Sequence, residues 1–554
     1  MKQRTARSRR LALGALSIPL SLAVLAGCSS PTSPSPQGES ADPVTGGTLI
    51  YASGDAEPTC LDPHVGGNYP QALVASQYLE TLFTKDANGQ IVPWLAESTK
   101  VSEDGLVRTI TVRDGITFHD GTKLGAEAVK ANIEHLQDPD TASSTGYLAV
   151  GKVGQIKLVD ERTAELHLST PDNALLESLS MPWTAIQSPK ALEREQSANC
   201  ASPVGTGPFK VDSWDRQDAV HLVRNEDYVS PAPQQGREQQ GAYLDGITWR
   251  FIPEAATRYA ALSSGEVDVI DNAQPDTISS AEGAGLGHLD APRPGASNRI
   301  ELNSAKAPFD DIKVREAFIR ALDVNAGIDA LFFGTAPRSY SLLSSVEPLG
   351  ISQEALFAPD VAKAEQLLDE AGWNQRDAEG YRVKDGKRLS VSFPVSTNQS
   401  VPAEQSLFEQ IQASAKKVGI EVKINLLDLS SWYGALAKHE YNLVSAPYTK
   451  VGPSVLRILY HSDSTVPAPS GYFANNAQLK DPQIDQLLTE AEQTEDEAER
   501  AEKYRKAQEL ILGGYYVLPL YDQQNHFLYG KDVKGMGATT AVSTPVYYDV
   551  FLDR

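Results

Sequence analysis

The chain of 554 residues is poor in the side chains that most metal and redox sites use. It has three cysteines, three methionines and nine histidines. The histidines are scattered without a pair four positions apart, and no Cys-x-x-Cys sequence occurs. Structural zinc sites and thiol redox centres are commonly built from such pairs. We therefore expect no bound metal and no cofactor.

Basic residues are also scarce, with 49 lysines and arginines against 72 aspartates and glutamates, and the formal net charge is −23. So acidic a chain lacks the positive surface that binds nucleic acid. Hydrophobic residues (41%) and charged residues (22%) occur in the proportions of an ordinary globular protein. This composition excludes a wholly disordered chain, a collagen and a multi-span membrane protein.

Sequence motifs of catalysis are absent as well. The chain contains no G-x-S-x-G nucleophile elbow, no H-E-x-x-H zinc motif and no G-x-x-x-x-G-K phosphate loop. Aspartate and glutamate are so numerous that two carboxylates near each other in the sequence do not indicate a catalytic pair. In a chain of this length, we take these absences as evidence against an enzyme.

The N-terminus has the pattern of an export signal. Residues 1–10 are basic, and residues 11–26 are apolar but too short for a convincing membrane span. Leu25-Ala26-Gly27-Cys28 follows and resembles the lipobox of bacterial lipoproteins, in which the signal is cut before a cysteine that receives lipid. We expect residues 1–27 to be a signal peptide and Cys28 to be acylated. The alternative is a plain secretory signal with an incidental cysteine, and Ser8-Arg9-Arg10 leaves the choice between Sec and twin-arginine export open.

Residues 28–45 are rich in serine and proline and are predicted to be a tether. Lipid and tether would hold the body at the outer face of the cytoplasmic membrane, an oxidising location. Two cysteines then remain, Cys60 and Cys200. An even pair in this compartment favours one disulfide, and two buried free thiols are the alternative.

The body of the chain carries repeated α/β signals. Alternating patterns predict strands at 47–53, 106–112, 164–168 and 247–252, and helical periodicity predicts helices at 70–83, 125–136 and 359–371. A longer helical period runs over 482–511 and is broken at most once. The fold class indicated is α/β.

The clearest unit spans 389–448 and reads as strand, helix, strand, helix, strand. Its strands are predicted at 389–395, 420–427 and 441–446, and its helices at 407–418 and 431–439. Such a unit favours a parallel sheet with right-handed crossovers. Because ligands bind beyond the carboxyl ends of parallel strands, the segments 396–400, 428–431 and 447–450 are candidate ligand contacts.

Five segments resemble one protein family when they are taken in order. They are YLETLFTKDANGQIVPWLAESTKVSEDG (78–105), RTITVRDGITFHDGTKLGAEAVKANIE (108–134), SPVGTGPF (202–209), LNSAKAPFDDIKVREAFIRALDVNAGI (302–328) and AEQLLDEAGW (364–373). Together they resemble the large extracytoplasmic solute-binding proteins of ABC importers, the dipeptide, oligopeptide and nickel group known as family 5. The glycines of SPVGTGPF also have a structural interpretation, since they permit backbone conformations closed to other residues.

The resemblance implies a two-lobe periplasmic-binding-protein-like fold of type II, in the large class with an extra subdomain and a ligand cleft between the lobes. Lobe I would comprise 46–300, with the subdomain at about 84–195, and the chain would return to lobe I over 521–554. Lobe II would be 301–520. Hinge strands are expected near Asn298–Asn303 and Leu518–Gln523.

The resemblance further implies a lipid-anchored, monomeric substrate-binding component that captures a small solute by closing its lobes. It would then deliver the solute to the permease and ATPase subunits of an importer. An extracytoplasmic hydrolase or peptidase, or a sensory receptor on the same scaffold, is the alternative. The group covers peptides, metal chelates, sugars and opines, so the sequence leaves the ligand open.

The expected ligand contacts come partly from the three segments above and partly from the resemblance. They are Asn68, Tyr69, Asn303, Asn398, Ser431, Tyr448, Lys450 and Arg457. Peptide-binding relatives usually place an aspartate just after the strand that corresponds to 441–446, and here that place holds no acid but offers Lys450. An anionic ligand and weak binding of simple peptides are therefore expected. In the alternative, Lys450 points to solvent and Asp428 takes the role of that aspartate.

Overall fold

The computed structural model describes residues 42–86, 88–229, 241–397, 399–445, 448, 450, 452–494 and 496–554. The chain divides into two units, Met1–Asp42 and Pro43–Arg554, and the fold below is that of the second. The predicted signal peptide and Cys28 lie outside the described residues, as does the tether up to residue 41. No helix in the described parts of the chain is long and apolar enough to cross a membrane.

A seven-stranded mixed sheet forms the centre of the first lobe, in the order β12-β21-β11-β1-β10-β9-β8. Its strands are β1 (Thr48–Ser53), β8 (Phe209–Asp215), β9 (Ala219–Arg224), β10 (Gly246–Phe251), β11 (Val269–Ile270), β12 (Gly287–Pro292) and β21 (Gln524–Tyr529). β1 runs parallel to β10 and β11, and the other pairs are antiparallel. The helices of this lobe are α1 (Tyr69–Ala75), α7 (Ala255–Ser264) and α8 (Pro275–Gly283). In the core, Tyr51 of β1 stacks on Trp249 of β10 with ring centres 3.8 Å apart.

A smaller antiparallel sheet, β4-β5-β7-β6, has its own hydrophobic core between Leu82 and Ile186, and we refer to it as the subdomain. Its strands are β4 (Ala96–Val101), β5 (Val107–Val112), β6 (Val153–Leu158) and β7 (Thr163–Leu168), preceded by the hairpin of β2 (Phe83–Lys85) and β3 (Ile91–Pro93). Its helices are α2 (Ala126–Gln137), α3 (Thr145–Val150), α4 (Leu175–Ser178) and α5 (Pro189–Leu192), and α6 (Gln196–Ala201) follows it.

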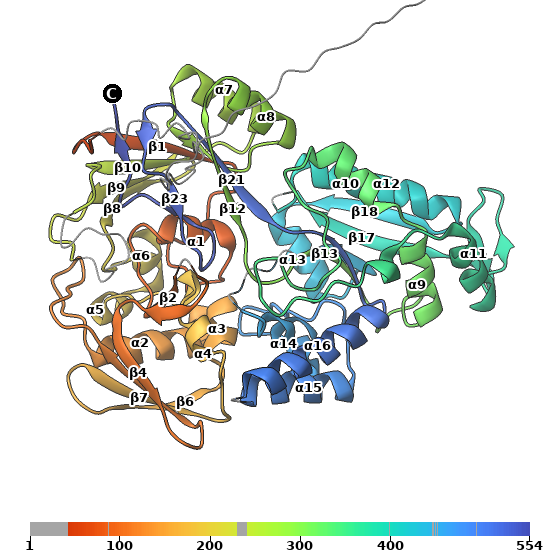
Figure 1. The fold of residues 1–554 in the computed structure, drawn as a ribbon, viewed down its shortest axis with the longest axis horizontal. Helices are drawn as coiled ribbons and strands as arrows, with labels where there is room; N and C mark the ends of the chain where they lie inside the picture. The colour runs from red at the N-terminus through yellow and green to blue at the C-terminus, as the bar shows by residue number, and fades with distance from the viewer. Residues whose placement is uncertain are drawn as a thin grey trace, which may run out of the picture. The chain divides into compact units, whose positions relative to one another are not determined.

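The second lobe contains β13 and helices and strands drawn from green to blue in Figure 1. Its main core has members from Ala296 to Tyr521, and a smaller cluster lies beside it, formed by Trp432, Leu436, Tyr441, Val444 and Phe473. Its strands are β13 (Asn298–Leu302), β14 (Gln375–Arg376), β15 (Arg382–Lys384), β16 (Lys387–Arg388), β17 (Ser390–Ser396), β18 (Glu421–Leu427), β19 (Leu443–Ser445) and β20 (Val517–Tyr521). Its helices are α9 (Ile312–Arg320), α10 (Val324–Phe332), α11 (Val361–Glu370), α12 (Pro402–Lys417), α13 (Leu429–Ala437), α14 (Val455–Tyr460), α15 (Pro482–Gln493) and α16 (Glu497–Gly513).

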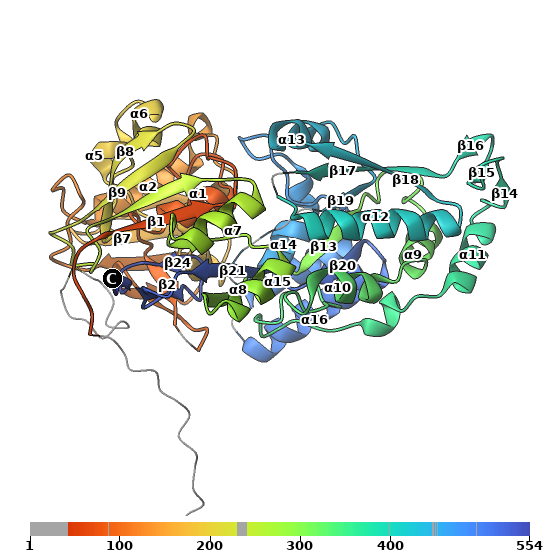
Figure 2. The same cartoon turned by 90° about the horizontal axis from the view of Figure 1, so that it is seen from above.

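The chain passes between the lobes twice, from β12 to β13 and from β20 to β21 (Figure 2). β12 and β21 pair in the seven-stranded sheet, whereas β13 and β20 pair in the sheet β19-β13-β20 of the second lobe. The residues between these sheets are 293–297 on one crossing and 522–523 on the other. A hydrogen bond from Arg293 N to Gln523 O, 2.9 Å long, ties the crossings together. The first crossing ends directly before the predicted hinge segment Asn298–Asn303, and the second lies within the predicted segment Leu518–Gln523.

The end of the chain returns to the first lobe. Tyr547, Tyr548 and Val550 are buried in the core of that lobe beside residues of β1 and β10. The last strands are short: β22 (Val533–Lys534) pairs with β25 (Phe551–Leu552), and β23 (Gly537–Ala538) pairs with β24 (Pro545–Val546).

Helix α1 is shorter than the predicted helix at 70–83, because the chain after Ala75 bonds to another segment. Gly207 N donates to Tyr78 O at 3.1 Å, and Phe209 N donates to Gln77 O at 3.2 Å. A Cβ atom at Gly205 would lie 2.0 Å from Tyr78 O. This close approach of two backbones is the structural role of the SPVGTGPF glycines.

The unit at 389–448 contains the expected elements, but its third strand joins a different sheet. β17 and β18 form a parallel pair over seven residues. β19 instead pairs antiparallel with β13, and Asn442 N donates to Ser392 O at 2.9 Å at the approach to β17. The predicted parallel pairing is therefore confirmed for β17 and β18 but does not extend to β19, whose three residues pair with β13.

Candidate functional site

A cavity of about 1240 Å³ is lined by both lobes. First-lobe residues come from the loop after β1, the start of α1, the loop before α7, the segment after β11, the β12–β13 crossing and β21. The subdomain adds Ser144, Thr145 and Trp183. The second lobe contributes the segments after β17 and β18, helix α13, Tyr448 and residues 470–473. Because the lining crosses the hinge, relative motion of the lobes would open and close this cavity.

The second-lobe wall lies beyond the carboxyl ends of the parallel strands β17 and β18. Thr397, Gln399 and Ser400 follow β17, and Asp428, Leu429 and Ser430 follow β18. This is the edge at which open α/β sheets bind ligands. Two of the three candidate segments named from the sequence are thereby brought together. The third is represented by Tyr448, whose neighbours at 446, 447 and 449 lie outside the described residues.

The first-lobe wall includes the start of helix α1. Asn68 caps this helix through its side chain, which accepts from Gln71 N at 3.1 Å. The indole Nε1 of Trp183 donates to Asn68 O at 3.0 Å. Tyr69, the first residue of the helix, lies under the guanidinium of Arg293, whose Cζ is 4.0 Å from the ring centre. This geometry places an aromatic ring and a positive charge side by side on the wall.

Among the residues that the structure describes, seven lining side chains other than histidine are acidic or basic: Asp55, Glu57, Glu254, Arg258, Asp271, Arg293 and Asp428. Two of them, Asp271 and Arg258, form hydrogen bonds within the first-lobe wall. Asp271 accepts from Tyr51 Oη at 2.6 Å and from Ser53 Oγ at 2.9 Å. Arg258 donates to the carbonyl oxygens of Ile252, Pro253 and Asn272 at 2.7 to 2.9 Å.

Three more of these carboxylates organise the local backbone. Glu254 caps helix α7 by accepting from Ala256 N and Thr257 N. Asp428 caps helix α13 and accepts from Ser431 N at 3.0 Å and from Ser431 Oγ at 2.6 Å. Glu57 accepts from Trp214 Nε1 at 2.8 Å and from Gln217 N at 3.0 Å. Each of these charges is compensated by protein donors.

Asp55 and Arg293 are side chains of opposite charge that line the same wall. Asp55 Oδ1 accepts one hydrogen bond, from Asn272 Nδ2 at 3.0 Å. Burial, reinforced by the nearby charge of Asp271, raises the pKa of Asp55 to about 7, although Asn272, Arg293 and Arg258 act in the opposite direction. A group with this pKa changes its charge near neutral pH and responds strongly to a charged ligand.

The structure places the predicted ligand contacts in different surroundings. Asn68, Tyr69 and Tyr448 line the cavity. Asn398 lies outside the described residues. Asn303, Ser431, Lys450 and Arg457 are described, and they are not among the residues that line the cavity.

Lys450 is the largest departure from expectation. It is 2% exposed, and its Nζ donates to Ser178 Oγ of the subdomain at 3.2 Å and to Ser454 Oγ at 2.9 Å. Ser454 Oγ in turn donates to Glu177 Oε2 at 3.1 Å. The ammonium group is thus used in a contact between lobe and subdomain, neither facing the cavity nor pointing to solvent. The prediction of an anionic ligand depended on Lys450 facing the cavity, and Lys450 does not face it.

The other three residues have structural partners of their own. Arg457 forms ion pairs with Glu492 at 3.3 Å and Asp463 at 3.3 Å. Asn303 is buried at the end of β13, where its Nδ2 donates to Tyr441 O at 3.3 Å. Ser431 bonds to Asp428 at the start of α13, as described above. These three residues are near lining residues in the sequence. Their side chains instead bond to a backbone carbonyl or to carboxylates.

A second contact between the subdomain and the second lobe lies close to Lys450. Lys152 forms ion pairs with Asp172, at 3.5 Å, and with Glu492 of α15. Asn173 Nδ2 donates to Thr494 O at 2.8 Å, and Asn173 N donates to Glu492 O at 3.1 Å. We call the set Lys152, Asp172, Asn173, Glu177, Ser178, Lys450, Ser454, Glu492 and Thr494 the interlobe contact.

The sequence interpretation missed Asp55 and Arg293. Asp55 follows the carboxyl end of β1, so the rule that identified the second-lobe segments would also have found it. Arg293 lies in the β12–β13 crossing, and its approach to Tyr69 joins positions more than 200 residues apart. Sequence order gives no signal for such a pairing.

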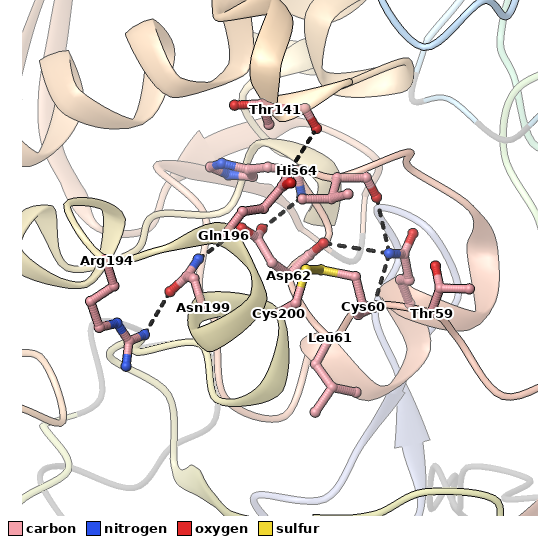
Figure 3. Close-up of a disulfide and its surroundings, with 12 residues drawn as sticks. Thr59, Cys60, Leu61, Asp62, His64, Thr141, Arg194, Gln196, Asn199 and Cys200 are labelled. Atoms are coloured by element: carbon pink, nitrogen blue, oxygen red, sulfur yellow. Dashed lines mark hydrogen bonds between the residues drawn. A yellow bond between two sulfur atoms is a disulfide. The ribbon is translucent and has the colours of Figure 1, made fainter.

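Cys60 and Cys200 form a disulfide in the structure, with their Cα atoms 4.5 Å apart (Figure 3). It links the loop after β1 to the last turn of α6. The adjacent backbones are also joined, because Leu61 N donates to Cys200 O at 2.9 Å. The bridge therefore fastens α6 to a loop whose neighbouring residues line the cavity.

Comparison with known proteins agrees with this geometry. Residues 90–469 match the family described as bacterial extracellular solute-binding proteins, family 5. The glutathione-binding protein GsiB of Salmonella typhi is 30% identical over 492 residues, which are 86% of this chain and 89% of that protein.

Two solved structures have the same fold. The periplasmic binding protein DppA of Helicobacter pylori, in complex with the peptide STSA, superimposes with a TM-score of 0.80 at 24% identity, covering 92% of this chain and 99% of DppA. The binding protein AgaA of A. tumefaciens R10, in complex with agropinic acid, has a TM-score of 0.78 at 26% identity, with coverage of 92% and 99%.

Two lobes joined by two crossings around a solute-sized cavity define the periplasmic-binding-protein fold of type II. The chain belongs to family 5 of the bacterial extracellular solute-binding proteins. It is the solute-binding component of an ABC importer, it works outside the cytoplasm, and its partners are a small solute and the importer's permease. The family consists of transport binding proteins rather than enzymes, which favours this function over a hydrolase or a receptor.

Proposed function

We propose that the protein captures a small zwitterionic solute derived from amino acids, such as a short or modified peptide, in the cavity between its lobes. The observation that carries this proposal is that Asp55 and Arg293, two side chains of opposite charge, line the same wall of the cavity. An ammonium group would pair with Asp55, and a carboxylate would pair with Arg293. In a closed cavity with little water, a charge without such a partner is costly to bury.

The remaining lining suits the rest of such a solute. Tyr69, Tyr433, Tyr448, Tyr472 and Phe473 supply apolar surface, and Asn68, Gln399 and Ser400 supply hydrogen-bonding groups. A volume of about 1240 Å³ exceeds the few hundred to 1000 Å³ of typical small-molecule sites. It leaves room for a solute of several residues together with water. The names of the relatives, which bind glutathione, a peptide and agropinic acid, are consistent with this class.

Native mass spectrometry of the protein purified without refolding tests the proposal. We expect a co-purified compound that carries both an ionisable amine and a carboxylate. Calorimetry with that compound and with analogues blocked at the amine or at the carboxylate should show weaker binding for each blocked form. A bound compound without an amine, or blocked analogues that bind equally well, would contradict the proposal.

The finer points of organisation are part of the same proposal. We place the lobe boundaries near residues 300 and 520 and the subdomain at about 84–195, in keeping with the separate hydrophobic cores. Cys28 would carry the lipid anchor, residues 28–45 would be its tether, and the protein would act as a monomer at the outer face of the cytoplasmic membrane. It would release its solute unchanged, without catalysis.

A further inference from the structure

We propose that Asp62, His64 and His135 form a binding site for a divalent transition-metal ion, best matched by Zn²⁺, outside the solute cavity. One ligand atom from each of the three side chains lies within 4.8 Å of the others. Asp62 and His64 stand in the loop after the disulfide residue Cys60, and His135 stands in the last turn of α2 in the subdomain. A metal here would clip helix α2 to the first lobe.

The two imidazoles face each other through a specific nitrogen. His64 Nε2 lies 2.8 Å from the carbonyl oxygen of Ala185, which can only accept a hydrogen bond. His64 therefore carries its proton on Nε2, and the lone pair of Nδ1 points to His135 Nδ1, 3.0 Å away. Histidines that bind metals usually donate the other ring N–H to a carbonyl or carboxylate in this way.

The carboxylate of Asp62 accepts hydrogen bonds from neighbouring groups, and Figure 3 shows Asn199 beside it. Asp62 accepts from Gln187 Nε2 at 2.7 Å and from Asn199 Nδ2 at 2.8 Å. Asp62 also accepts from His64 N at 2.9 Å, which fixes the turn between the two ligands. Hydrogen bonds of this kind orient ligating carboxylates and are themselves part of a metal site.

The types of ligand atom and their burial indicate which metal ion the site would bind. Asp62 and His64 are 1% and 0% exposed, whereas His135 is partly exposed and leaves a path for entry. Two imidazoles and one carboxylate, with water as a fourth ligand, form a tetrahedral set typical of Zn²⁺. The site has too few oxygen ligands for Ca²⁺ or Mg²⁺. When the ion is absent, the two Nδ1 atoms share one proton in a hydrogen bond.

Zinc titration of the full-length chain tests the site. After removal of metals with EDTA, Zn²⁺ is added in competition with a chromophoric chelator. We expect one Zn²⁺ per chain and a rise in the thermal unfolding midpoint, because the ion binds the folded state only. His135→Ala should weaken Zn²⁺ binding by at least about tenfold. Losing a residue that only bonds to a metal ligand already weakens binding by about this factor, and His135 would be a ligand itself. It should also abolish the rise in the midpoint.

A second histidine pair provides a matched control. His288 Nε2 lies 3.1 Å from His526 Nδ1, so His288→Ala removes a comparable ring contact elsewhere in the first lobe. Zinc binding should be unchanged in that variant. If His135→Ala does not fold, His135→Gln keeps an amide near His64 and still removes the imidazole. Absence of Zn²⁺ binding, binding that survives both changes at His135, or equal losses in the His288 control would overturn the proposal.

Discussion

Lys450 Nζ lies 3.2 Å from Ser178 Oγ, so a buried ammonium group of the second lobe touches the subdomain outside the solute cavity. With Glu177 and the Lys152–Glu492 ion pair beside it, this contact can form only when the lobe and the subdomain are together. We expect this contact to favour the closed conformation independently of solute. Part of the free energy of closing would then come from the interlobe contact, and part from the contacts of the solute in the cavity.

Replacing Lys450 by methionine should therefore open the protein. Lys450→Met keeps the apolar stem but removes the ammonium group and leaves Glu177 without its main compensating charge. We expect a larger open fraction in the solute-free protein and several-fold weaker solute binding, since affinity falls with the fraction that can close. Small-angle X-ray scattering and calorimetry measure the two effects.

Lys438→Met is the matched control, because Lys438 is exposed at the end of α13 and belongs to the same lobe. It should change neither the scattering profile nor the affinity. Should Lys450→Met leave both quantities at their original values, the interlobe contact has no part in closure.

Solute binding should strengthen as the pH rises through about 7. Burial raises the pKa of Asp55 to about 7, so much of this carboxyl is protonated in slightly acidic solution. An ammonium group binds the ionised form, and its arrival lowers the pKa and releases a proton. The affinity for the co-purified solute should increase from pH 6 to pH 8 and then level off. Calorimetry in buffers of different ionisation enthalpy counts the released proton.

Asp55→Asn should remove this pH dependence and weaken binding at pH 8. Glu57→Gln changes a neighbouring carboxylate that bonds to Trp214, and it should keep the dependence. A pH profile that is equally steep in the Asp55→Asn variant would assign the titration to another group.

The positions of many helices and strands could be predicted because they depend on local patterns. The long helical period at 482–511 is divided between α15 and α16, and Asp496 caps the second helix by accepting from Glu499 N at 2.8 Å. The strand pairing of β19 could not be predicted, because its three residues pair with a strand more than 100 positions earlier. Local periodicity carries no information about such a partner.

The same distinction separates the two walls of the cavity. The second-lobe wall follows from strand order, since residues beyond two parallel strands meet at one edge. The first-lobe pair Asp55 and Arg293 depends on the hinge crossing, which no local pattern specifies. The sequence correctly placed Lys450 in a segment next to the cavity. Its side chain, however, bonds to Ser178 of the subdomain, which is distant in the sequence.

The stability of the fold should depend on Glu80. This buried carboxyl accepts from Thr206 Oγ1 at 2.7 Å, Tyr228 Oη at 2.8 Å and Trp94 Nε1 at 3.2 Å. Burial nevertheless raises its pKa to about 7. Between the pKa of the unfolded chain, near 4.5, and 7, the folded state keeps a proton that the unfolded state loses. The free energy of unfolding should therefore fall as the pH rises through this window.

Glu80→Gln should reduce that fall by up to about 3 kcal/mol, the equivalent of a shift of roughly 2.5 pH units. Urea unfolding at pH 5 and pH 8 measures the difference. Glu103→Gln alters an exposed glutamate of the subdomain and should leave the pH dependence unchanged. If the two variants behave alike, Glu80 does not govern the effect.

The disulfide should make a large contribution to stability. It closes a loop of 140 residues, for which the chain-entropy argument gives about 4 to 5 kcal/mol as an upper value. Intact-mass measurement after alkylation should find no reactive thiol at Cys60 or Cys200 without reductant and two with it. The reduced protein should unfold at a lower temperature. Two alkylatable thiols in the native, unreduced protein would refute the bridge.

Lipid attachment at Cys28 remains a prediction from the sequence alone. One acyl chain binds a membrane only marginally, so stable anchoring requires two or more chains on the processed cysteine. Cys28→Ala should release the protein from the membrane fraction or leave an uncleaved precursor, and mass spectrometry of the wild-type N-terminus should find acyl chains on Cys28. Ser29→Ala, next to the cleavage site, should leave anchoring intact. If Cys28→Ala protein stays membrane-bound and is still cleaved correctly, the segment is an ordinary export signal and the anchor lies elsewhere.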